Sequence, residues 1–154
     1  MVKLNQVFTK ETFMAYLDNF HLIVGETIME CQRIEHDIKL IYAGMLKGDF
    51  NENLDIVKDK ALGPVLVDLE KLDNSDGNPY LKQGDYKLLK EIKDIRNWLV
   101  HKAYMDFMYD KDTNWERNLN RSYNKLLDFN KRMKTLGNQV ENVRFDILKH
   151  FGRI

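Results

Sequence analysis

The sequence predicts an all-α protein, an antiparallel bundle of four or five helices. Apolar residues recur every three or four positions over three long segments, which is the helical period. The strict alternation typical of a half-buried strand is hard to find. The chain has only two prolines, Pro64 and Pro79, and both lie in one central stretch. Long helices with short links pack as antiparallel neighbours, so we expect a single helical domain over residues 1–154.

Composition excludes several classes of protein. The 154 residues carry 24 basic and 24 acidic side chains, which argues against a strongly basic nucleic-acid coat and against an acidic tail. A single cysteine, Cys31, excludes an internal disulfide framework. No apolar run approaches about 18 residues, the length of a membrane-spanning helix. No cysteines and histidines have the spacing of a zinc site, and no glycine-rich phosphate-binding loop is present. We therefore expect a cytoplasmic protein that does not enter a membrane and needs neither a metal nor a cofactor.

The first helix is expected from about Thr9 to Leu46. The apolar stripe of its later half consists of Val24, Ile28, Cys31, Ile34, Ile38, Ile41, Tyr42 and Met45. At 100° per residue these side chains form one band wide enough to face a core. Gly44 and Gly48 are expected to loosen the helix end, and whether Gly25 divides the helix stays open.

The middle of the chain is more often interrupted. Residues 53–62 are long enough for about two helical turns. Gly63-Pro64 is expected to start a second short helix, because proline suits the first turn. The run of small and polar residues over 73–79 predicts a loop.

Two longer helices follow. One is expected to begin near Gly84-Asp85, with Asp85 as N-cap, and to end between Tyr104 and Tyr109. Its core stripe consists of Leu88, Ile92, Ile95 and Leu99. The last helix opens on a T-x-x-E capping box at 113–116. It is expected to reach about His150 or to kink at Gly137.

The helix after the loop carries an unusual polar face. On a helical wheel Asp94, Asn97, His101 and Tyr104 cluster opposite the core stripe, and Arg96 lies between the two faces. An ordinary surface helix would show lysine and glutamate there. An aligned acid, amide, imidazole and phenol instead favour a polar cleft or an interface with a second copy of the chain.

The run Arg96-Asn97-Trp98-Leu99-Val100-His101 resembles the signature of the HEPN superfamily of all-α domains. That signature is an arginine, often followed by asparagine, with a histidine after four to six residues. The resemblance is close over the motif and loose over the surrounding bundle. HepT-type toxins of the superfamily carry a tyrosine two residues after the histidine, whereas Tyr104 stands three residues after it.

The resemblance implies metal-independent endoribonuclease activity, with two motifs meeting across a homodimer in one composite cleft. RNA supplies its own nucleophile, the 2′-hydroxyl. His101 would be the acid or base, since an imidazole titrates near neutral pH. Arg96 would clamp the phosphate, and Asn97 would orient the histidine or the substrate. A toxin–antitoxin or abortive-infection role, and an antitoxin or regulatory partner, rest on the resemblance alone.

Two supporting residues are predicted. Glu35 falls inside the apolar stripe of the first helix, where an unpaired carboxylate is costly. We expect it to contact Arg96 or His101; the alternative is an ion pair with Lys39 four residues on. Tyr104 is expected either as a packed aromatic at the helix end or as a hydrogen-bonding group in the cleft and a target of modification.

Charge is unevenly distributed along the balanced chain. Residues 114–154 contain nine Lys/Arg and four Asp/Glu, a local charge of +5. The cations Arg117, Arg121, Lys125, Lys131, Arg132 and Lys134 either border a phosphate-binding groove or form an ordinary solvated face. A non-catalytic helical module that binds a nucleotide, RNA or a protein partner is the alternative to a nuclease.

Overall fold

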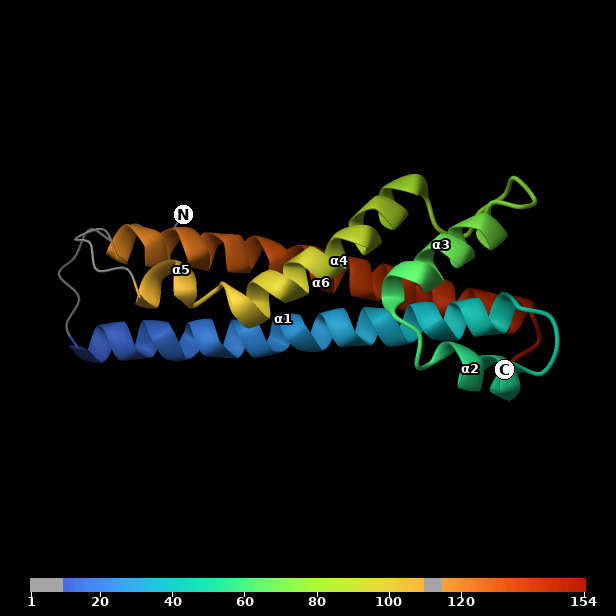
Figure 1. The fold of residues 1–154 in the computed structure, drawn as a ribbon, viewed down its shortest axis with the longest axis horizontal. Coiled ribbons are helices and arrows are strands. Elements are labelled where there is room, and N and C mark those ends of the chain that lie inside the picture. Colours follow the sequence, from blue (N-terminus) through green and yellow to red (C-terminus); the bar gives the residue numbers. More distant parts are fainter. Residues whose placement is uncertain (1–9, 110–114) are drawn as a thin grey trace. The chain divides into compact units, whose positions relative to one another are not determined.

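The computed structural model describes residues 10–109 and 115–154, and all the regular structure within them is helical (Figure 1). The prediction of an all-α protein is confirmed. The helices are α1 (Lys10–Met45), α2 (Phe50–Val57), α3 (Leu62–Asp73), α4 (Gln83–His101), α5 (Met105–Met108) and α6 (Trp115–His150). The antiparallel arrangement of the helices and the two-fold dimer stay predictions.

The chain divides into two compact units that share the long helices. The first unit comprises the chain up to Glu30 together with Asp94–Lys134, and the second comprises Cys31–Lys93 together with Thr135–Ile154. Each unit therefore takes a part of α1, α4 and α6, and each has its own core.

Aromatic side chains build the core of the first unit. Phe20 on α1 is fully buried and meets the rings of Tyr104, Phe107 and Tyr123 edge-on or tilted, with centroids 5.3–5.6 Å apart. Such edge contacts add to the free energy gained from burial. They tie the first half of α1 to α5 and to the first half of α6.

The second unit has an aliphatic core with one buried ion pair. Ile34, Ile38 and Ile41 of α1 are fully buried, as the predicted stripe requires. Among them lies the carboxylate of Asp37, only 1% exposed, which accepts a hydrogen bond of 2.5 Å from Arg144 of α6. A buried charge tolerates this environment only when it is paired.

The end of α1 is held by the last turn of the chain. Arg153 donates hydrogen bonds to the backbone oxygens of Gly44, Leu46 and Gly48. Gly44 lies in the last turn of α1, whose carbonyls have no partner within the helix, and Leu46 and Gly48 follow the helix end. Gly44 also allows a close approach, because an added Cβ would lie 2.7 Å from a methyl carbon of Leu148.

The loop after α3 is closed by the buried carboxylate of Asp73. It accepts hydrogen bonds from the backbone nitrogens of Tyr80 (2.8 Å) and Leu81 (3.1 Å) and from the hydroxyl of Tyr86 (2.7 Å). Burial, and then the hydrogen bond to Asp73, raise the pKa of the Tyr86 phenol far above its ordinary value. The neutral phenol therefore remains a donor to Asp73.

Two questions that the sequence left open concern glycines within the long helices, and both helices are continuous. Helix α1 runs from Lys10 without a break at Gly25, and α6 runs through Gly137 to His150. Pro64 lies in the first turn of α3, as expected. The predicted capping residue Thr113 and the link at 111–112 lie outside the described residues.

Three predicted boundaries are wrong. Helix α2 begins earlier than residue 53, because Asp49 caps it by accepting from the backbone nitrogen of Glu52. Asp85 is not the N-cap of α4: it lies in the first turn and accepts from the backbone nitrogen of Lys82. Helix α4 ends at His101 rather than beyond Tyr104.

The early end of α4 has a local cause. The backbone nitrogens of Lys102 and Ala103 both bond to the carbonyl oxygen of Trp98, at 2.9 and 2.8 Å. This widened last turn ends α4, and the chain becomes helical again in α5. The turn is stabilised because it buries Phe107, which is only 3% exposed.

We predict that Asp73→Ala lowers the free energy of unfolding by about 3 kcal/mol, because it leaves buried donors without an acceptor. Urea denaturation followed by circular dichroism measures the change. Asp76→Ala is the matched control: its carboxylate lies in the same loop, is exposed, and accepts from the nearby backbone nitrogen of Asn78. Equal effects of the two substitutions would contradict the assigned role of Asp73.

Candidate functional site

The predicted catalytic residues all lie in the first unit, at the end of α4. Arg96 is half-buried, whereas Asn97 and His101 are exposed, and His101 is the last residue of the helix. Five helical residues separate Arg96 from His101 by about 7.5 Å along the axis and about 140° around it. The two side chains therefore leave the helix on different faces.

The expected alignment of four polar residues is incomplete. Asp94, Asn97 and His101 keep the predicted spacing on α4 and are exposed. Tyr104 is no longer helical, because it lies in the turn between α4 and α5. Its position is set by this turn and by its contacts rather than by the helical period.

Tyr104 has a partner that the sequence did not indicate. Its hydroxyl lies 2.6 Å from Nδ1 of His21 on α1, and the two rings are stacked with centroids 5.3 Å apart. Its ring also packs edge-on against Phe20. Burial raises the pKa of the Tyr104 phenol. Tyr104 is therefore a packed aromatic, the first of the two alternatives, and its hydroxyl bonds to His21; a role in a cleft stays a prediction.

His21 was assigned no role from the sequence. It stands 83 residues from Tyr104, and no spacing rule connects positions so far apart. Its exposed imidazole adds a second titratable group beside the segment that follows His101. The only local signal was its place one position after Phe20, a core residue of the same helix.

Trp98 connects the end of α4 to α5 and α6. Its indole Nε1 donates a hydrogen bond of 3.0 Å to the Asp106 carboxylate. Its ring meets Phe129 at 5.5 Å, and the Lys125 ammonium lies 4.8 Å from its centroid. The Trp98 side chain is 5% exposed, so it is a buried anchor of this unit.

A polar pocket of about 300 Å³ adjoins this tryptophan within the first unit. Its lining residues come from α5 and α6: Asp106, Asn118, Arg121, Ser122 and Lys125. Two of the predicted groove-forming cations, Arg121 and Lys125, are among them. The other four predicted cations do not line it: Arg117, Lys131, Arg132 and Lys134.

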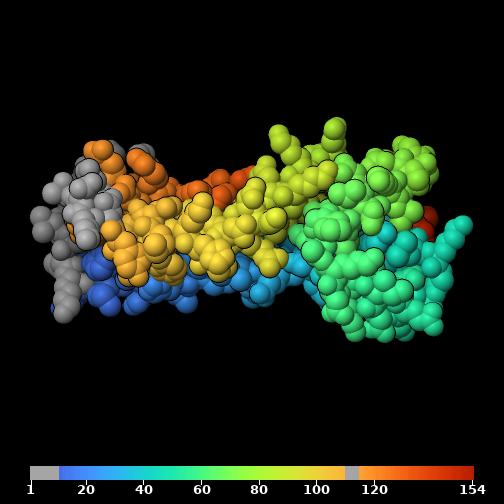
Figure 2. Space-filling model, viewed as in Figure 1, coloured from blue at the N-terminus to red at the C-terminus, as the bar shows by residue number. Residues whose placement is uncertain are grey.

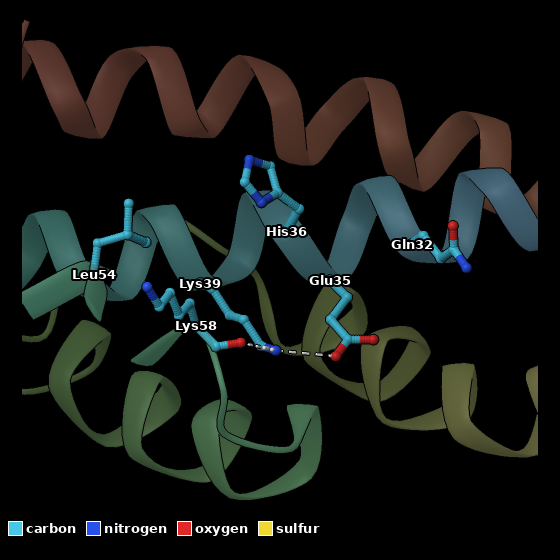
Figure 3. A pocket seen from close by; sticks show the side chains of 6 residues that line it. All are labelled: Gln32, Glu35, His36, Lys39, Leu54 and Lys58. Carbon is cyan, nitrogen blue, oxygen red and sulfur yellow. Dashed lines mark hydrogen bonds and ion pairs between the residues drawn. The ribbon is translucent and has the colours of Figure 1, made fainter. Parts of the chain in front are cut away.

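Glu35 belongs to the second unit. It is half-buried, and its carboxylate pairs with the Lys39 ammonium at 3.1 Å, the alternative given above (Figure 3). Lys39 also donates to the backbone oxygen of Lys58 at 2.9 Å. The contact of Glu35 with Arg96 or His101 stays a prediction. The fully buried carboxylate of this helix is Asp37 instead.

Glu35 lines an open pocket of about 380 Å³ (Figure 3). The other lining residues are Gln32, His36, Lys39, Leu54 and Lys58. Its two lysines are already paired, Lys39 with Glu35 and Lys58 with Asp55. This neutralisation leaves the pocket little capacity to hold an anion.

Over 10–109 and 115–154, no helix is apolar over a membrane-spanning length. In the same part of the chain, no three His, Cys, Asp or Glu side chains converge as a set of metal ligands.

We predict that Tyr104→Phe lowers the free energy of unfolding by about 1 kcal/mol at neutral pH, because it removes the hydrogen bond to His21 but keeps the ring contacts. The pKa of the Tyr104 phenol is higher in the folded than in the unfolded protein. Its stabilising contribution is therefore fully present below pH about 10 and is lost as the pH rises through the pKa of the folded state. Urea denaturation should therefore show the difference from wild type shrinking in alkali. Tyr109→Phe, at an exposed tyrosine, is the control and should change little.

Comparison of the chain with protein-family models, with curated proteins and with solved structures finds no match.

Proposed function

We propose that the protein is a metal-independent endoribonuclease of HEPN type that acts as a homodimer in a toxin–antitoxin or phage-defence role. The observation that supports this most is the exposed His101 imidazole at the end of α4, with the half-buried Arg96 five residues before it on the same helix. These are the residues of the HEPN-like motif.

The proposed reaction needs one group to take a proton and one to give a proton. A neutral His101 imidazole removes the proton from a 2′-hydroxyl, whose oxygen attacks the adjacent phosphorus. The bond to the 5′-oxygen breaks, and a protonated imidazole supplies the proton that this leaving oxygen takes. The products are a 2′,3′-cyclic phosphate and a 5′-hydroxyl.

Arg96 and Asn97 have supporting roles in this scheme. The guanidinium of Arg96 is always charged and can donate two parallel hydrogen bonds to phosphate oxygens. It would stabilise the negative charge that develops on the phosphoryl group in the transition state. The exposed amide of Asn97 would orient His101 or bind the substrate.

A homodimer would supply both imidazoles, one from each copy. Apolar side chains beside His101 favour such an interface: Val100 is 61% exposed, Met105 57% and Met108 54%. The surface over 94–109, yellow to gold, contributes to the face drawn in Figure 2. Exposed apolar side chains gathered beside a candidate site are typical of protein contact surfaces.

We predict that purified protein cleaves a labelled structured RNA in the presence of EDTA and leaves cyclic-phosphate ends. His101→Ala should reduce the rate by about 10²–10⁴-fold, the usual contribution of a general acid or base. His36→Ala is the control, because it removes another exposed histidine, which lies in the second unit. Expression of wild type should arrest growth, and His101→Ala should relieve the arrest.

Two outcomes would overturn this assignment. Cleavage that is equally fast with His101→Ala removes the catalytic role of the histidine. No cleavage, with RNA or nucleotide bound in an Arg96-dependent manner, favours the alternative of a non-catalytic HEPN-like binding module.

We predict that Val100→Glu prevents dimerisation and cleavage together, because it places a charge in the proposed apolar interface. Light scattering during gel filtration measures the oligomeric state. The control is Val67→Glu, at an exposed valine of α3 in the second unit that is 48% accessible. A Val100→Glu monomer that retains full activity would contradict a composite site.

A further inference from the structure

The pocket between α5 and α6 combines two cations with a carboxylate. Asn118, Arg121, Ser122 and Lys125 follow one another at helical spacing on one face of α6, and Asp106 faces them from α5. All of these residues belong to the first unit. The pocket volume, about 300 Å³, is at the lower end of the range for small-molecule sites.

The cations of this pocket are available to an anion. Within 10–109 and 115–154, neither Arg121 nor Lys125 forms an ion pair with a carboxylate. Lys125 instead lies over the rings of Trp98 and Phe129, at 4.8 and 5.7 Å. Two cations one helical turn apart are a suitable arrangement for a phosphodiester.

The carboxylate of Asp106 adds a hydrogen-bond acceptor of negative charge to the pocket. Oδ2 of Asp106 accepts the indole hydrogen of Trp98, which fixes its orientation. Its remaining lone pairs can accept hydrogen bonds from the amino group of a base, as carboxylates do from cytosine N4. This carboxylate would repel a bare phosphate, whereas a nucleotide offers an anionic phosphate for the cations and a base amino group for the carboxylate.

The pocket also adjoins the proposed catalytic segment. Trp98, which contacts both Asp106 and Lys125, stands three residues before His101, about 4.5 Å along the axis of α4. The pocket and His101 are therefore linked through one residue of the same helix.

We propose that this pocket binds one nucleotide of single-stranded RNA, with its phosphate on Arg121 and Lys125 and an amino-bearing base on Asp106. This inference rests on the proposed ribonuclease function and deepens it, because it names the part of the protein that selects the substrate.

The test measures binding of fluorescent oligocytidine and oligouridine of about ten nucleotides to the His101→Ala protein by anisotropy. A further Arg121→Ala should weaken binding of both about tenfold and reduce the slope of log K against log salt by about 0.7. Lys131→Ala, the matched control, removes a cation of the same helix that does not line the pocket, and should change affinity less than about twofold.

A second variant tests the base-binding end. Asp106→Asn keeps an oxygen that can accept from Trp98 but removes the charge, and should reduce the preference for oligocytidine over oligouridine about tenfold. An unchanged preference overturns the base contact. Equal effects of Arg121→Ala and Lys131→Ala overturn the phosphate contact.

The outcomes separate this inference from the ribonuclease proposal. If wild type cleaves RNA but Arg121→Ala and Lys131→Ala change the affinity for RNA equally, the nucleotide-pocket proposal is wrong and the ribonuclease proposal stands. If binding depends on Arg121 and Asp106 but wild type does not cleave, the pocket stands and the ribonuclease proposal falls. If no RNA binds and none is cleaved, both are wrong.

Discussion

The end of α4 depends on the side chain of Trp98. Its indole hydrogen bond to Asp106 holds α5 against the helix that precedes it, and its ring packs on Phe129 of α6. A buried indole needs a partner for its N–H, so the position of Asp106 is restricted by the burial of the tryptophan. The segment that contains His101 and Tyr104 lies between these two linked residues.

Polar groups have different roles in the two units. In the second unit the buried carboxylates Asp37 and Asp73 are saturated by an arginine and by three donors respectively. Groups held in this way stabilise the fold and have little remaining capacity for a ligand. In the first unit His21, Asn97 and His101 are exposed. The predicted catalytic residues Arg96, Asn97 and His101 lie in this first unit.

The pairing of His21 with Tyr104 shows why a helical wheel is an incomplete guide to a site. A wheel compares residues on one helix and assumes that the helix continues. Here α4 ends at His101, and Tyr104 turns toward α1 instead of extending the polar stripe. The reason is packing, since the turn buries Phe107 against Phe20. The wheel also placed Glu35 within the apolar stripe of α1. In the structure Glu35 pairs locally with Lys39, and Asp37, two residues later, is the buried carboxylate.

The all-helical class, the extent of α1 and α6, and the grouping of Arg96, Asn97 and His101 were available from the sequence. They depend on period, composition and local spacing, which are properties of neighbouring residues. The end of α4, the partner of Tyr104, the burial of Asp37 and the polar pocket beside Trp98 emerged only from the tertiary structure. Each of these depends on contacts between residues distant in the chain, or on a widened turn that Phe107 stabilises by its burial. Such contacts leave no periodic signal, because the free energy that favours them comes from packing and from satisfying buried polar groups.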